Sequence, residues 1–323
     1  MKPRLRFLAA ASLLGALPMA LPALAQDYPT RSIRIVLPFA PGGGTDTLAR
    51  VLAQRFQESF GQTTVVDNRP GAGGNIGAEL VAKSPPDGYT LMFTTSTVAT
   101  SVTLYPKLAF DARKDLIPIS QIGSTSALLT VHPSVPVRGV KELVALSKTT
   151  KGGLNFGSNG SGTTSHLAGV MFQQATGASL THIPYKGAAP ALTALIGGET
   201  ELAFPGVNSA LPSLRAGKVR GLAVTTKRKS SVLPEMPTLD SLYPGFDIDN
   251  WFVLFAPAGT PSAIINRLHA EVLKSMQHPD MKAFMAREGA EPVGSTPAEA
   301  AAFVNREVEK FARIVKAAGV KAE

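Results

Sequence analysis

Cysteine is absent from the 323-residue sequence, and its absence excludes several kinds of chemistry at once. Without cysteine there is no disulfide framework, no thiolate metal site, no cysteine nucleophile and no residue of this type to carry a lipid. We therefore expect an unanchored protein held together by a hydrophobic core, which a chain of this length can build without covalent links.

The motifs of common α/β enzymes are missing as well. No glycine of the three glycine-rich loops discussed below precedes a lysine, as a P-loop requires, and no serine lies in a G-x-S-x-G nucleophile elbow. Gly71, Gly73 and Gly77 form G-x-G-x-x-x-G, one residue longer than the dinucleotide fingerprint. The five histidines are widely spaced and no H-E-x-x-H is present, so we expect no metal, no cofactor and no catalytic residue.

Positive charge is in moderate excess, with a net charge of +9. Three of the cations, Lys2, Arg4 and Arg6, precede an apolar segment and would leave with it, so the mature chain carries about +6. The other cations are spread along the chain, and the densest run, 227–229, is typical of a solvated loop rather than of a nucleic-acid surface. We expect no nucleic-acid partner.

The N-terminus has the three parts of a cleavable signal peptide. Its cations are followed by an uncharged run over 7–25 that ends in A-L-A, which predicts a signal peptide over 1–25 and cleavage near Ala25/Gln26. The alternative is an uncleaved membrane anchor, because the run approaches spanning length. No later run is long enough to cross a bilayer, so we expect an exported, periplasmic protein that is not itself membrane-embedded.

From residue 31 onward, short β-branched runs alternate with helical patterns, which predicts an α/β fold with parallel strands and helices on both faces of the sheet. We expect strands at 33–37, 63–66 and 89–94, one helix ending at Gly61 and another over 75–83. The pattern restarts with strands at 155–156, 181–183, 201–204 and 221–225 and helices at 165–175 and 188–196.

This restart indicates two α/β lobes. The extended apolar segments 127–131 and 252–256 would carry the chain to the second lobe and back. We assign 1–25 to the signal peptide, 26–125 and 252–323 to a discontinuous first lobe and 126–251 to the second lobe, with a ligand cleft between the lobes.

The C-terminal part carries two helix-start signals. Thr260 followed by Pro261 predicts an N-cap with proline at the first helical position, and Thr296 with Glu299 predicts a capping box. Apolar residues at helical spacing follow each signal, and we interpret these stripes as core-facing surfaces.

Three loops rich in glycine and small hydroxyls, 41–46, 69–75 and 157–163, each lie between a predicted strand and a helix start. Glycine lets the backbone approach a ligand closely, and a helix N-terminus presents unpaired N–H groups with partial positive charge. Such loops can hold a carboxylate or phosphate without a lysine or arginine. The alternative is that they are merely tight turns, which is less attractive for three loops at the ligand-binding edges of α/β sheets.

Three residues near these loops have two interpretations each. His166 is either a hydrogen-bonding residue at a helix terminus or a ligand contact. Asp46 caps its helix and complements the dipole, or it orients the loop or a ligand amine. Trp251 is either a packed core ring or part of the cleft lining.

Short motifs in a fixed order along the chain carry a more specific signal. They include PFAPGG at 38–43, NRPGAGGNIG at 68–77, PDGYT at 86–90, PYKG at 184–187 and FAPAGTP at 255–261. In these residues the sequence resembles the substrate-binding proteins of tripartite tricarboxylate transporters, the Bug or TctC-like family. The resemblance implies the two-lobed architecture of type II periplasmic binding proteins.

The resemblance also implies where a ligand carboxylate is held, largely by backbone N–H groups and water. The first-lobe contacts it implies are Gly43, Gly44, Ala72 and Gly73, and the second-lobe contacts are Ser158, Thr163, Ser165 and His166. Further candidates, from the neighbourhood of the loops and from the family, are Phe39, Thr45, Asp46, Thr95, Ser96, Phe204, Asn208 and Asp249.

The leading hypothesis is a monomeric solute receptor that captures a small carboxylate by closing its cleft and delivers it to integral membrane transporter subunits. The family implies di- and tricarboxylates, aromatic acids and acidic amino acids as ligands, without choosing among them. A ligand-sensing receptor for a membrane signalling protein is an alternative of the same class. The rival class is an exported α/β enzyme, which the missing motifs argue against.

Overall fold

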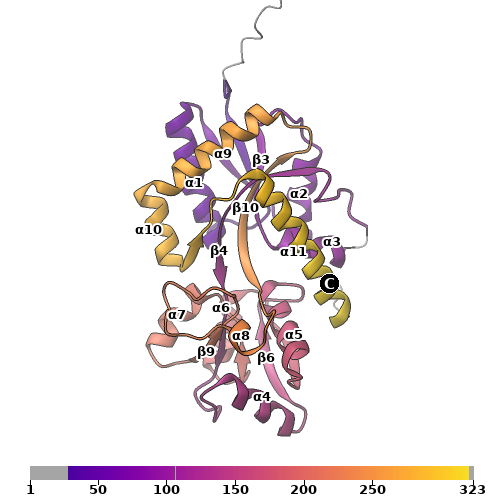
Figure 1. Cartoon of the computed structure of the whole chain (residues 1–323), viewed down its shortest axis with the longest axis vertical. Helices are drawn as coiled ribbons and strands as arrows, with labels where there is room; N and C mark the ends of the chain where they lie inside the picture. Colours follow the sequence, from indigo (N-terminus) through magenta and orange to yellow (C-terminus); the bar gives the residue numbers. More distant parts are fainter. Residues whose placement is uncertain (1–27, 106, 320–323) are drawn as a thin grey trace, which may run out of the picture.

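The alternating strand and helix patterns fold into two lobes, each built on its own β-sheet (Figure 1). This fold is that of a computed structural model, which describes residues 28–105 and 107–319. The signal peptide and its cleavage site lie outside the described residues. Within the described residues, no helix combines the length and apolar character needed to cross a membrane.

The first lobe carries a six-stranded sheet in the order β11-β4-β10-β3-β1-β2. Its strands are β1 (Ile33–Leu37), β2 (Thr64–Asn68), β3 (Thr90–Thr95), β4 (Leu116–Ser126), β10 (Asp249–Pro257) and β11 (Ala290–Pro292). Its helices are α1 (Gly44–Phe60), α2 (Asn75–Ala82), α3 (Thr97–Leu104), α9 (Ser262–Gln277), α10 (Pro279–Glu288) and α11 (Pro297–Ala318), with a short 3₁₀ turn at Ala72–Gly74.

The second lobe carries a five-stranded sheet in the order β7-β6-β8-β5-β9. Its strands are β5 (Leu128–Val131), β6 (Leu154–Ser158), β7 (Leu180–Pro184), β8 (Leu202–Ala203) and β9 (Arg220–Val224). Its helices are α4 (Val140–Thr149), α5 (Thr164–Thr176), α6 (Ala188–Ile196), α7 (Val207–Arg215) and α8 (Leu239–Leu242).

Local capping chemistry explains where several helices begin and end. Gly61 ends α1 in the left-handed conformation at φ 67°, as predicted, since glycine has no Cβ to clash there. The capping box of Thr296 and Glu299 is present at the start of α11. The prediction for α9 was wrong by one position, because Pro261 is the N-cap and the Thr260 hydroxyl donates to the Pro257 carbonyl instead.

The parallel pairing predicted for the strands over 33–94 is confirmed, but both sheets as a whole are mixed. β1 pairs in parallel with β2 and β3, but β10 is antiparallel to β3 and to β4. In the second sheet β6 is parallel to β7 and β8, whereas β5 is antiparallel to β8 and β9. β4 leaves the first lobe and β10 returns to it, so two neighbouring strands necessarily run in opposite directions.

The two connections between the lobes lie side by side and are joined by one buried side chain. Going outward, the chain passes from β4 through Ala127 into β5, and on return β10 already pairs with β4 at Asp249, three residues before the predicted segment. The Thr225 hydroxyl lies 3.0 Å from the Ala127 amide nitrogen and donates to the Ile248 carbonyl at 2.7 Å. Thr225 therefore ties the outward connection to the returning one.

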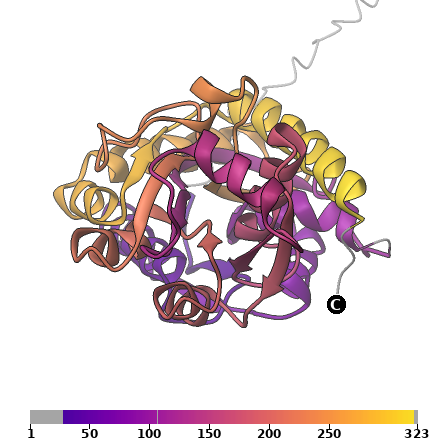
Figure 2. The same cartoon turned by 90° about the horizontal axis from the view of Figure 1, so that it is seen from below.

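Helices cover both faces of the first sheet, as predicted. The residues Ile33, Ile35 and Leu37 pack with α1, α9 and α10 on one face, while Val36 packs with α2, α3 and α11 on the other. Seen along the long axis, the lobes overlap and the yellow α11 runs along their periphery (Figure 2).

Trp251 belongs to the core rather than to the cleft. Its ring is fully buried on β10 and meets Phe303 of α11 edge-on at 5.5 Å. The indole nitrogen donates to Glu307 Oε2 at 3.1 Å, which satisfies its only polar group.

Candidate functional site

A cavity of about 320 Å³ lies between the two lobes, and both lobes line it. From the first lobe its lining includes Gly44, Thr45, Thr97, Asn250, Phe252 and Glu288. From the second lobe it includes Asn159, Thr163, Thr164, Ser165, Phe204 and Asn208. The walls combine three phenylalanine rings with small hydroxyls and amides, a lining typical of sites for small ligands.

Five helices begin at this cavity. The first residues of α1, α3 and α6 line it, and so do the N-cap residues Thr163 of α5 and Gly206 of α7. The first turn of each helix leaves N–H groups without intrahelical partners and carries partial positive charge. The cavity is therefore suited to an anion.

The charged side chains at the cavity are few. Among its lining residues within the described part of the chain there is no lysine, arginine or histidine, and one carboxylate, Glu288. The same residues contain no group of three His, Cys, Asp or Glu that could hold a metal ion. Favourable electrostatics for an anion must therefore come from helix N-termini and polar groups.

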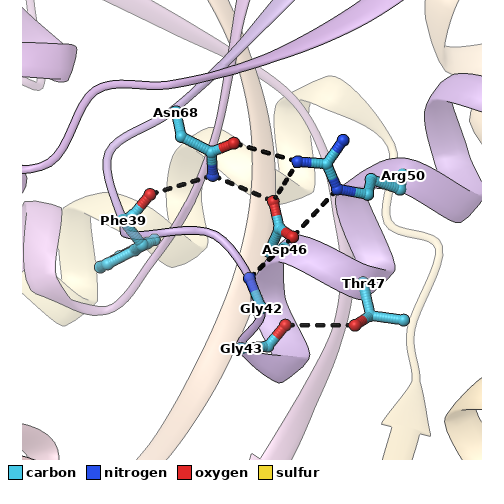
Figure 3. Close-up of polar contacts among 7 residues, drawn as sticks. All are labelled: Phe39, Gly42, Gly43, Asp46, Thr47, Arg50 and Asn68. Atoms are coloured by element: carbon cyan, nitrogen blue, oxygen red, sulfur yellow. Dashed lines mark hydrogen bonds and ion pairs between the residues drawn. The ribbon is translucent and has the colours of Figure 1, made fainter.

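The loop that enters α1 is held in place by Asp46 (Figure 3). Its carboxylate accepts hydrogen bonds from the Gly42 backbone N–H at 3.0 Å and from the Asn68 side-chain amide at 2.9 Å. Arg50 donates to both carboxylate oxygens, and its guanidinium holds the pKa of Asp46 down to about 2. An ionised Asp46 thus fixes the backbone leading to the cavity residues Gly44 and Thr45.

The loop that enters α5 is held by its own hydroxyls. The Thr163 hydroxyl donates to the Gly160 carbonyl at 2.7 Å and accepts from the His166 backbone N–H at 3.5 Å. The Ser165 hydroxyl accepts from the Asn159 backbone N–H at 2.9 Å. Both of these side chains, Thr163 and Ser165, line the cavity as well.

His166 lies behind this loop rather than in the cavity lining. Its Nδ1 accepts from the Gly162 backbone N–H at 3.0 Å, and its ring stacks on His182 at 3.7 Å. Burial, with a smaller contribution from His182, lowers the pKa of His166 to about 4. A neutral imidazole at a helix terminus, the first of the two interpretations, describes its contacts.

Two side-chain hydrogen bonds cross between the lobes beside the cavity. The hydroxyls of Ser96 and Thr164 are 3.0 Å apart, and Ser96 also donates to the side-chain oxygen of Asn250 at 3.1 Å. The Asn208 amide donates to Glu288 Oε2 at 2.6 Å. The two lobes are therefore already in polar contact.

The sequence-predicted site residues fall into three groups. The residues that line the cavity are Gly44, Thr45, Thr163, Ser165, Phe204 and Asn208. Those in the segments that precede α1, α3 and α5, or in the first turns of these helices, are Gly43, Asp46, Thr95, Ser96, Ser158 and His166. Those placed elsewhere are Phe39, Ala72, Gly73 and Asp249.

Two of these placements have a clear physical reason. A Cβ on Gly73 would come 2.8 Å from the Tyr105 hydroxyl, so that loop is packed against its own lobe. Asp249 and Asn250 are neighbours on β10, and successive side chains of a strand point to opposite faces. Asn250 therefore faces the cavity, while Asp249 lines a second hollow with Lys227.

Sequence reasoning missed several lining residues, among them Thr97, Asn159, Thr164, Asn250 and Glu288. Asn159 and Thr164 lie within or beside a loop that was singled out, so a wider selection around that loop would have found them. The start of α3 at Thr97 was missed because its β-branched residues are poor helix formers. Glu288 reaches the cavity only through the packing of α10.

Fold and site together are those of a two-lobed solute-binding protein. The family described as "Tripartite tricarboxylate transporter family receptor", TctC, matches residues 48–320. The chain belongs to this family, which confirms the resemblance seen in the motifs. As a member it is a solute-binding receptor and not an enzyme.

Relatives and solved structures agree with this placement. The chain is 37% identical to "Protein BugT" of Bordetella pertussis over 306 residues, which is 94% of each chain. It matches a structure of an R. palustris protein with adipate at 36% identity and a TM-score of 0.79, over 91% of this chain and 99% of that one. It matches MatC from Rhodopseudomonas palustris with bound malate at 31% identity and a TM-score of 0.75, over 89% and 100% of the two chains.

Proposed function

We propose that this receptor captures a small carboxylate in the cavity between its lobes and delivers it to the integral membrane subunits of a tripartite transporter. It acts as an exported monomer whose signal peptide is removed near Ala25. Closure of the two lobes around the β4 and β10 connections encloses the ligand.

One observation carries this proposal: five helix N-termini, from both lobes, meet at a cavity that no basic side chain lines among the described residues. Oriented N–H groups stabilise a carboxylate without a formal positive charge. The adipate and malate found in two structurally similar proteins are carboxylates, which supports the same ligand class here. We propose ligand contacts from the α1 and α5 first turns, together with Phe204 and Asn208.

A thermal-shift and calorimetry panel of mono-, di- and tricarboxylates tests the proposal. A carboxylate at one hundred times its dissociation constant should raise the free energy of unfolding by about 2.7 kcal/mol. If no member of the panel shifts the melting temperature or binds in calorimetry, the proposed function is wrong.

A matched pair of variants localises the binding. Thr97→Val removes a hydroxyl from the cavity wall, and the loss of one neutral hydrogen bond should weaken binding about three- to tenfold. Thr149→Val removes an exposed hydroxyl on α4, away from the cavity, and should leave affinity unchanged. Equal effects of the two substitutions would place the ligand elsewhere.

Export and delivery are tested separately. Mass spectrometry of the secreted chain should give a mature N-terminus at Gln26. Cells that lack the receptor should lose uptake of the bound carboxylate and recover it on complementation. Unimpaired uptake would contradict the transporter role and favour a signalling receptor.

A further inference from the structure

Glu288, the last residue of α10, places a carboxylate in a cavity otherwise suited to anions. Its side chain is only 19% exposed, so it is not a freely rotating surface charge. Oε2 accepts from the Asn208 amide at 2.6 Å, and Oε1 accepts from the Arg287 Nε at 3.1 Å. A carboxylate offers about four acceptor positions, so about two remain for a donor in the cavity.

Glu288 makes the surroundings of the α1 start unlike those of the α5 start. A Cβ built on Gly44 would lie 3.4 Å from Glu288 Oε2, which places this carboxylate at the start of α1. That end already holds a negative charge next to the α1 N-terminus. At the start of α5 the cavity is instead lined by the neutral side chains Asn159, Thr163 and Ser165.

Arg287 does not cancel this asymmetry. It is 65% exposed, stacks over the Phe284 ring at 5.2 Å and does not line the cavity, so water screens much of its charge. A second carboxylate brought to the α1 end would face Glu288 at close range. Like charges juxtaposed across a buried contact are strongly unfavourable, whereas an ammonium group would pair with Glu288.

We infer that the preferred ligand is an amino-carboxylate zwitterion, whose ammonium group binds Glu288 and whose carboxylate binds the start of α5. This inference rests on the proposed function and narrows it to one chemical class. Dicarboxylates of the same length are the class that Glu288 rejects. Glu288 thus determines specificity, while the helix N-termini provide the general affinity for a carboxylate.

Calorimetry with matched ligands tests the inference. The five-carbon set is 5-aminopentanoate, glutarate and pentanoate, and the four-carbon set is 4-aminobutanoate, succinate and butanoate. In the mature wild-type protein the amino acid of at least one set should bind roughly tenfold or more tightly than its dicarboxylate. Pentanoate and butanoate measure affinity for the carboxylate alone.

One variant separates the charge of Glu288 from its contact with Asn208, and a second variant is its control. Glu288→Gln keeps an acceptor oxygen for Asn208 but removes the charge, and should abolish the preference for the ammonium ligand or reverse it. Glu291→Gln removes a charge at another contact between lobes, where Glu291 accepts from the Ser231 backbone N–H at 2.8 Å outside the cavity. This control should keep the wild-type preference.

The outcomes test the inference separately from the proposed function. Tighter binding of the dicarboxylates by the wild type would overturn the inference and leave the carboxylate receptor intact, and this comparison needs no variant to fold. Equal loss for all ligands in Glu288→Gln would make Glu288 a contact between lobes and not a specificity residue. If carboxylates of the wider panel bind but no amino acid does, the inference is wrong, and if nothing binds, the proposed function fails with it.

Discussion

Replacing Asp46 by asparagine should destabilise the first lobe, because its carboxylate accepts four hydrogen bonds at once. Gly42 and Asn68 each donate one bond to it, and Arg50 donates two, at distances between 2.9 and 3.1 Å. Asparagine has one acceptor oxygen and one NH₂ group. Two of the four donors would therefore face another donor, and the charge that pairs with Arg50 would be lost.

The pKa of Asp46 gives the magnitude. Its hydrogen bonds with Arg50 hold the pKa at about 2, against an ordinary value of 3.8. A shift of this size corresponds to about 2 kcal/mol at neutral pH. Arg50 is 52% exposed and solvent screens its charge, so we expect a loss of about 1–2 kcal/mol.

Urea unfolding of wild type and Asp46→Asn measures this loss. Because the pKa of Asp46 is depressed in the folded state, its contribution is complete above about pH 4 and declines as the pH falls towards 2. The difference between the two proteins should thus be largest at pH 7 and smaller at about pH 3. Asp87→Asn, at the exposed pair with Arg31, is the control and should cost about 0–1 kcal/mol. A larger loss in that control than in Asp46→Asn, or no loss at Asp46, would refute the reasoning.

Three further variants probe the start of β10 and the loop that enters α5. Burial raises the pKa of Asp249 to about 6, so ionisation of this carboxyl lowers the free energy of unfolding as the pH rises from about 4 to 6. Asp249→Asn should therefore raise the free energy of unfolding by about 1–3 kcal/mol at pH 7 and change it little at pH 4. Burial lowers the pKa of His166 to about 4, so the free energy of unfolding falls as the pH drops from 6.5 to 4. His166→Asn should flatten this dependence on pH, which urea unfolding at several pH values measures. Gly162→Ala adds a Cβ at φ +76° that would lie 2.5 Å from a methyl group of Leu104 in the other lobe, so it should weaken ligand binding in calorimetry. Gly152→Ala is the control, because Gly152 has a similar φ of +85° but open space around it. This control should lower the free energy of unfolding by about 1–2 kcal/mol without affecting binding.

The pH predictions for Asp249 and His166 have opposite signs over nearly the same range. In the wild-type protein the two slopes partly cancel between about pH 4 and 6. A flat wild-type profile would therefore not contradict either prediction. The single variants are needed to separate them.

Sequence signals that act over a few residues predicted most elements well. Strand β1 and helix α6 have the predicted bounds, and α1 ends at Gly61 as expected. These signals depend on the apolar period, on capping side chains and on glycine's access to left-handed backbone. All three are properties of neighbouring residues, which a single sequence contains.

The site was predicted only in part, because strand faces and helix packing are not local properties. The sequence indicated Asp249, whereas β10 turns its neighbour Asn250 toward the cavity. His166 was singled out beside the α5 loop, and the structure places it behind that loop rather than in the cavity lining. Glu288 could not be found, since nothing near it in the sequence indicates that α10 ends beside α1 and α7.

The sequence by itself determined that this chain alternates strands and helices in two sets, starts several helices at glycine and hydroxyl loops, and belongs to a family of solute-binding receptors. Only the tertiary structure decided that β10 inserts between β3 and β4, which makes the sheet mixed, and that five helix N-termini meet at one cavity. The physical reason is the range of the interactions. Capping and periodicity act within a few residues, whereas strand order and the charge balance of a cavity depend on contacts between segments more than one hundred residues apart.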